Sequence, residues 1–65
     1  MHLIVDIDIG GPTFQGTTGL AEAAQQLREL ANEIERNVVD FSDCREGQRL
    51  AGTNGGCAIV YLADL

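Results

Sequence analysis

The chain has 65 residues and a net charge of −6, from ten carboxylates and four basic residues that are all arginine. A chain of this length buries only about 60% of the surface that its unfolded form exposes, which excludes a two-lobed enzyme and a repeat array. The negative charge disfavours nucleic acid and anionic membranes as partners, and a hydrophobic content of 45% excludes a disordered acidic tail. We therefore expect residues 1–65 to form one small folded domain.

The first expected element is a strand over residues 2–9. Leu3, Val5, Ile7 and Ile9 alternate with a second set of residues that includes two aspartates, a pattern typical of a half-buried strand. The segment 10–12, Gly-Gly-Pro, ends this strand. In the loop that follows, a phenylalanine at position 14 is expected to close one end of the core.

A helix is predicted over residues 19–36. Its apolar side chains recur every three or four residues and form one stripe: Leu20, Ala23, Leu27, Leu30 and Ile34. A hydroxyl of Thr17 or Thr18 is expected to cap the first turn. At about 27 Å, this helix is longer than the strand that it covers.

The C-terminal third predicts a hairpin. Residues 48–53 and 56–63 flank Asn54-Gly55, a pair that favours a two-residue type I′ turn. Such a turn places Ala51 opposite Ala58. The segment 38–41 is either a short edge strand or the start of a loop.

These elements predict an α+β fold of order β-α-β-β, with one helix packed on a three-stranded, mostly antiparallel sheet. The preferred arrangement places the last strand between the other two, so that every pair is antiparallel. The alternative pairs the first strand with the second through a right-handed parallel crossover.

The last strand, residues 57–63, is apolar on both faces, and one helix covers only one of them. A strand of this kind usually lies between two covering layers. We therefore expect a homodimer formed through the sheet, with Ile4, Val60 and Leu62 as candidate interface residues.

Few residues have side chains that could take part in catalysis or bind a metal ion. The sequence has one histidine, His2, and two cysteines, Cys44 and Cys57, which are expected to be free thiols. His2, Asp6 and Asp8 share one strand face, but they are too few ligands for a metal site without a further cluster. We therefore expect no catalytic residues, no metal and no cofactor.

No signal peptide and no apolar run long enough to cross a membrane are evident in the sequence, so a cytoplasmic location is expected. The acidic surface either serves solubility alone or binds a partner with a basic surface. The carboxylates proposed for partner binding are Glu22, Glu29, Glu33, Asp6 and Asp8.

Three segments also resemble a group of short, mostly uncharacterised phage and prophage proteins of strand–helix–hairpin type. They are Ile7-Asp8 with Phe14, the helix containing Leu-Arg-Glu-Leu-Ala at 27–31, and Leu50 to Gly55 with its Asn-Gly turn. The chain departs from that group at 10–12, in the longer 37–49 connection and at Gly56-Cys57.

The resemblance implies a phage origin and a role in the host cytoplasm. By analogy with short acidic phage proteins, we expect a non-catalytic inhibitor of a host defence protein, similar to anti-CRISPR proteins. Two alternatives remain: a homodimeric module that binds or sequesters a small nucleotide, and a structural or assembly protein.

Overall fold

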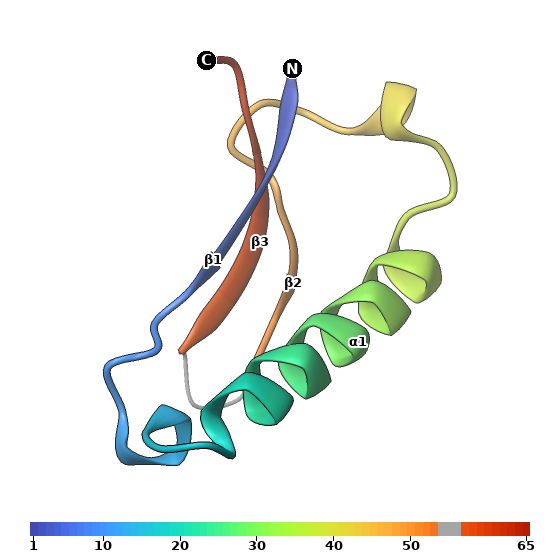
Figure 1. Ribbon diagram of the computed structural model, residues 1–65. Coiled ribbons are helices and arrows are strands. Elements are labelled where there is room, and N and C mark those ends of the chain that lie inside the picture. The colour runs from blue at the N-terminus through green and yellow to red at the C-terminus, as the bar shows by residue number, and fades with distance from the viewer. Residues whose placement is uncertain (54–56) are drawn as a thin grey trace.

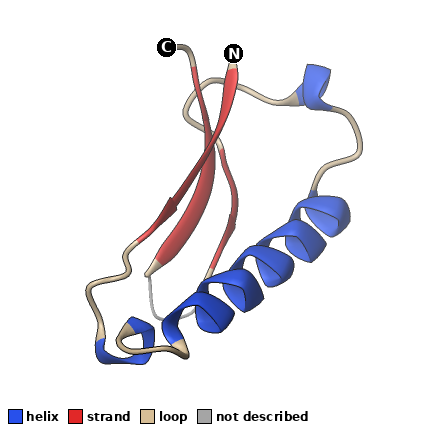
Figure 2. Cartoon of the chain, in the orientation of Figure 1, coloured by secondary structure: helices blue, strands red, loops and turns tan. Residues whose placement is uncertain are grey.

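The computed structural model of the chain describes residues 1–53 and 57–65 (Figure 1). Its strands are β1 (His2–Ile7), β2 (Arg49–Gly52) and β3 (Ala58–Ala63), and its long helix is α1 (Gly19–Asn37). Two 3-10 helices, η1 (Pro12–Phe14) and η2 (Phe41–Asp43), lie in the connections on either side of α1 (Figure 2).

The sheet has the strand order β1-β3-β2, and both neighbouring pairs are antiparallel. The α+β class and the central position of the last strand are therefore confirmed, and the alternative with a parallel crossover is wrong. The helix lies on one face of this sheet, which we call the inner face (Figure 1). The outer face carries no second layer among the residues that the structure describes.

Alternation along β1 and β3 assigns each side chain to one of these faces. The inner face carries residues 3, 5 and 7 of β1 paired with residues 62, 60 and 58 of β3. The outer face carries residues 2, 4 and 6 paired with 63, 61 and 59. Opposite residues of an antiparallel pair lie on the same face of the sheet. The apolar residues that alternate along β1 therefore share the inner face with their apolar partners in β3.

The register of the second strand pair differs from the prediction. Ala51 lies opposite Val60 rather than Ala58, a shift of two residues, and the strand pairing is irregular between Arg49 and Ala51. A shift of two keeps every side chain on the same face, so the hydrophobic pattern does not distinguish the two registers. The predicted Asn54-Gly55 turn lies outside the described residues.

Helix α1 begins at the predicted residue and ends one residue later than expected. Its apolar stripe is used unevenly: Leu30 is buried, while Leu27 is 48% and Leu20 is 84% exposed. The helix packs mainly on β2 and less on β3, and its first turns lie beside η1 (Figure 1). A helix longer than the sheet therefore leaves part of its stripe uncovered.

The start of α1 is held differently from the expectation. Thr18 is the N-cap residue, but its hydroxyl makes no capping hydrogen bond within the described chain, so the predicted hydroxyl cap is wrong. Instead, η1 packs closely on the first turn. A Cβ atom on Gly19 would lie 1.9 Å from the backbone oxygen of Phe14, so only glycine fits here. Phe14 itself is half-buried at this end of the molecule.

The core lies between α1 and the two strands β2 and β3. Its fully buried side chains are Leu30, Leu50, Ala51, Ala58, Val60 and Leu62. Val38 packs against this cluster, and the residues after it form a loop and η2 rather than the edge strand that the sequence left open.

Candidate functional site

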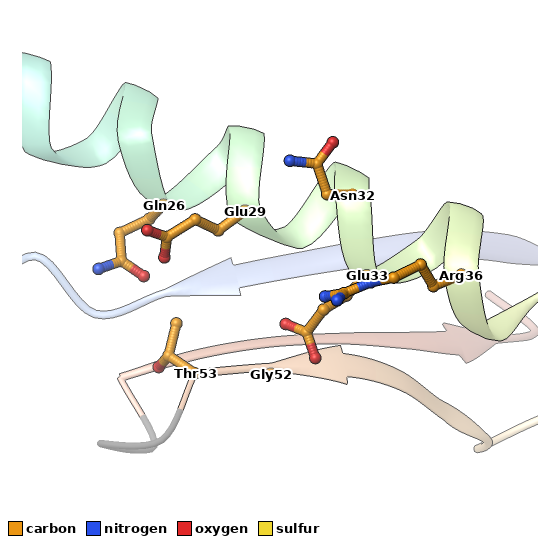
Figure 3. A pocket seen from close by; sticks show the side chains of 7 residues that line it. All are labelled: Gln26, Glu29, Asn32, Glu33, Arg36, Gly52 and Thr53. Carbon is orange, nitrogen blue, oxygen red and sulfur yellow. The ribbon is translucent and has the colours of Figure 1, made fainter.

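Three of the predicted partner-binding carboxylates lie along one flank of α1. Glu22, Glu29 and Glu33 are separated by seven and four residues, spacings that return to the same side of a helix. This flank runs beside β2 (Figure 3). We call it the acidic flank.

A groove separates the acidic flank from the end of β2. Its volume is about 370 Å³, and it is open to solvent (Figure 3). The residues that line it are Gln26, Glu29, Asn32, Glu33, Arg36, Gly52 and Thr53. Within the described part of the chain, this lining contains carboxylates, amides, one guanidinium and one hydroxyl but no histidine or cysteine.

Hydrogen bonds along the helix orient two of these side chains. Gln26 Nε2 donates to Glu22 Oε1 at 3.2 Å, and Gln25 Nε2 donates to Glu29 Oε1 at 3.3 Å. Because a carboxylate only accepts, the first bond directs the NH₂ group of Gln26 toward Glu22. Its Oε1 is then buried and receives no donor from the described residues. Gln26 therefore carries a buried acceptor without a donor beside the groove, but this atom has no surface exposed in it.

The carboxylates of the flank form no ion pair within 4 Å in the described chain, although Arg36 lines the groove and Arg49 lies near Glu33 and Gly52. Over residues 1–53 and 57–65, one ion pair lies within 4 Å, between the terminal amine of Met1 and Asp64 at 3.8 Å. Arg36 lines the groove without forming an ion pair with Glu29 or Glu33. The arrangement favours cationic groups and hydrogen-bond donors in the groove.

The two remaining predicted carboxylates do not join the acidic flank. Asp6 is exposed on the outer face of the sheet, opposite to the face that carries α1. Asp8 follows β1, and its Oδ1 accepts a hydrogen bond from the backbone N–H of Gly10 at 2.9 Å. The predicted set of five thus divides into a helix group of three and two separate carboxylates.

Sequence reasoning missed the partners of the acidic flank. Gly52 and Thr53 approach the helix only because β2 is the strand nearest to α1. Gln26 follows Glu22 by four residues, a spacing that places both on one side of a helix. This spacing could have predicted that Gln26 belongs to the candidate site.

The three predicted interface residues lie in different places. Val60 and Leu62 are buried in the core of a single chain, so they offer almost no surface to a second copy. Ile4 is half-buried on the outer face and keeps exposed surface. Of the three, only Ile4 is available for contact without opening the core.

The remaining reactive side chains form no recognisable centre. No three histidine, cysteine, aspartate or glutamate side chains lie close enough to hold a metal ion in the part of the chain that the structure describes. Cys44 and Cys57 are free thiols, and the Sγ atom of Cys57 lies 3.3 Å from Thr53 Oγ1. No helix in the described segments is long and apolar enough to span a membrane.

Comparison with known proteins adds no relative: no family model, curated protein or solved structure matches the chain. The resemblance to short phage and prophage proteins therefore stays a prediction from the sequence.

Proposed function

We propose that this chain is a small acidic phage or prophage accessory protein that binds and inhibits a host protein, without catalysis. The observation that supports the proposal is the acidic flank, whose Glu29 and Glu33 line an open groove without an ion-pair partner in the described chain. The proposed target is a defence component of the host cytoplasm with a basic surface.

The proposed binding mode follows from the chemistry of the groove. Lysine or arginine side chains of the partner approach Glu29 and Glu33, the two carboxylates that line the groove. Complementary charge mainly speeds association and makes it sensitive to salt. Exposed ion pairs contribute only about 0.2–1 kcal/mol each, so the affinity depends on the groups that become buried.

Inhibition is proposed rather than catalysis because of what the groove contains. Its described lining is open to solvent and presents carboxylates, amides, one guanidinium and one hydroxyl, groups that can contact a basic partner directly. A protein with such a surface acts by occupying a site on its target, for example a site that otherwise binds a polyanion.

Two variants with the same charge change test the role of the flank. The first combines Glu22→Gln, Glu29→Gln and Glu33→Gln; the control combines Asp43→Asn, Glu46→Gln and Asp64→Asn, all at exposed positions outside the flank. Each variant changes the net charge from −6 to −6 + 3 = −3. A role for the flank predicts that the first variant loses binding and the control keeps it.

The assay measures partner binding in lysate and inhibition of host defence in cells. Tagged protein is used to capture partners from host lysate at low and at high salt, and phage plating is measured on defence-positive cells that express each variant. We expect salt-sensitive capture of one protein and restored plating with the wild type and the control, but not with the flank variant. Equal loss in both variants, or salt-independent capture, would contradict the proposal.

The two alternatives give different results. A thermal shift of several degrees with one nucleotide, without a protein partner, would favour the nucleotide-binding module. A large species that grows with concentration in light scattering would favour an assembly protein.

A further inference from the structure

Strand β1 lies at an edge of the sheet. It pairs with β3 on one side and has no neighbouring strand on the other among the described residues. It is six residues long and pairs with β3 without irregularity. Its inner-face side chains Leu3 and Val5 are substantially exposed because α1 covers β2 and β3 instead. A regular, apolar, unpaired edge of this kind is a template for adding another strand.

The hydrogen bonds to β3 show which backbone groups of β1 face outward. Asp8 N donates to Cys57 O at 2.8 Å, which makes this pair a hydrogen-bonded one. Hydrogen-bonded and non-hydrogen-bonded pairs alternate along an antiparallel ladder. The even-numbered residues of β1 therefore bond to β3, and Leu3, Val5 and Ile7 present their N–H and C=O groups to the open edge.

We propose that this edge binds β1 of a second copy, antiparallel and about a two-fold axis, with Ile4 opposite Ile4. In this register Leu3 lies opposite Val5, and Met1 opposite Ile7, so the inner face pairs only apolar side chains. On the outer face, His2 lies opposite Asp6, where the imidazole N–H donates to the carboxylate. Each of these pairs occurs twice, as an isologous interface requires.

The backbone and the side chains together select this register. Only odd-numbered residues offer outward groups, so an odd residue must face an odd residue, and neighbouring allowed registers differ by two positions. One neighbouring register places Ile4 opposite Asp6, and the other places His2 opposite Ile4. Both set a polar side chain against Ile4 and lose the His2–Asp6 pairing. The first places His2 opposite Asp8 instead, which lies beyond β1 and whose Oδ1 already accepts from the N–H of Gly10.

A second copy also covers an apolar hollow beside β1. Its volume is about 470 Å³, and its lining includes Met1, Leu3, Phe41 and Leu62. In the proposed register, Val5 and Ile7 of the second copy lie opposite Leu3 and Met1, at the border of this hollow. The acidic flank lies at the other edge of the sheet, so the proposal is independent of the proposed function.

The sharpest test exchanges the two members of the His2–Asp6 pair. His2→Asp places two aspartates opposite each other, twice in each dimer, and we expect the dimer dissociation constant to rise roughly tenfold. The double variant His2→Asp/Asp6→His restores the pair in reverse and should return the constant to near the wild-type value. Both residues are exposed in the single chain, so the fold is retained.

Sedimentation equilibrium of the full chain measures these constants. We expect the wild type to approach twice the chain mass of 6.9 kDa with rising concentration. A wild type that stays at 6.9 kDa up to millimolar concentration would overturn the proposal. A double variant as weak as His2→Asp would also overturn it, because that result excludes the proposed register.

Two further variants test the edge and its axis. Val5→Pro removes an outward N–H and no bond to β3, so it should abolish the dimer while circular dichroism shows a folded chain. Ile4→Cys, in a Cys44→Ser/Cys57→Ser background, should form an interchain disulfide on oxidation, whereas Asp6→Cys should not. Equal cross-linking by the two cysteine variants, or a dimeric Val5→Pro, would contradict the pairing.

Discussion

Strand β1 and the neighbouring pair β2–β3 are covered differently on the inner face, although they belong to the same sheet. Val60 and Val5 are cross-strand partners on the inner face, yet Val60 is 0% exposed and Val5 is 44% exposed. The difference arises because α1 packs over β2 and β3 and leaves β1 beyond its reach (Figure 1). The same residue type on the same face thus belongs to the core in one strand and to the surface in the other.

The edges also differ in their backbone. Strand β2 is short and irregular, and Asn37 Nδ2 at the end of α1 donates to the carbonyl of Leu50 at 3.0 Å. Short strands, irregularities and covering side chains are devices that block further pairing. Strand β1 is longer and regular and lacks such a cover in the described chain. The comparison shows that one edge is closed by the chain itself and that the other is open in the described chain.

The comparison of the two valines gives the largest expected effect. Val60→Ala removes buried methyl groups and leaves a cavity, so we expect the free energy of unfolding to fall by about 2–3 kcal/mol. Val5→Ala should cost less than about 1 kcal/mol, because much of its side chain remains in water. Urea unfolding of both variants at low micromolar concentration, where association is weakest, measures the difference. Equal losses would mean that α1 also covers β1.

The next prediction concerns the end of α1 that packs on η1. Gly19→Ala forces its Cβ into the backbone oxygen of Phe14, a clash that exceeds the gain of about 1 kcal/mol from replacing glycine in a helix. We expect a net loss of about 1–2 kcal/mol in stability. Gly11→Ala is the control, because nothing lies within 4 Å of a Cβ atom there. Thermal unfolding of the two variants should separate them; a Gly19→Ala protein as stable as the wild type would refute the close packing.

Asn37→Ala tests the closed edge. The variant leaves the carbonyl of the buried Leu50 without its donor, so we expect a loss of about 1 kcal/mol. Gln25→Ala removes only exposed hydrogen bonds on the same helix, one to Glu29 and one from Arg28, and should change stability less. Chemical denaturation of both variants checks the order, and the reverse order would argue against a structural role for Asn37.

The smallest effect is expected at Asp40, in the connection that leads from α1 to β2. The backbone N–H of Ser42 donates to Asp40 Oδ1 at 2.9 Å and its hydroxyl at 2.8 Å, which holds the pKa of this carboxyl below its ordinary value of 3.8. Because the pKa is lower in the folded chain, the stabilisation is present above 3.8 and disappears as the pH falls through the folded pKa. The stability difference between wild type and Asp40→Asn should therefore shrink between about pH 6 and pH 2. A difference that is independent of pH would contradict this account.

Much of the fold could be predicted from particular residues. The alternation of Leu3, Val5 and Ile7 predicted the first strand, and the spacing of Leu27, Leu30 and Ile34 predicted the helix, because burial on one side imposes these periods. The register of β2 could not be predicted in this way, since a shift of two residues leaves the same faces buried.

The candidate site was predicted only in part. The sequence identified Glu22, Glu29 and Glu33 as carboxylates of the helix, and their local spacing of seven and four residues explains why they share one side. The contribution of Gly52 and Thr53 to the groove, and the separation of Asp6 from the helix carboxylates, depend on which strand lies nearest to the helix. That choice depends on packing between residues that are far apart in the chain.

The length of 65 residues and the charge of −6 indicated one small acidic domain. The spacing of apolar residues determined which segments form strands or the helix, and which side of each is apolar. The tertiary structure decided where the single helix lies. Val60 and Leu62, which the sequence had suggested for a dimer interface, became part of the core. Because one helix cannot cover three strands, its position over β2 and β3 left Leu3 and Val5 exposed instead. Local patterns state that a face is apolar, but only the packing of distant segments determines whether that face becomes core or surface.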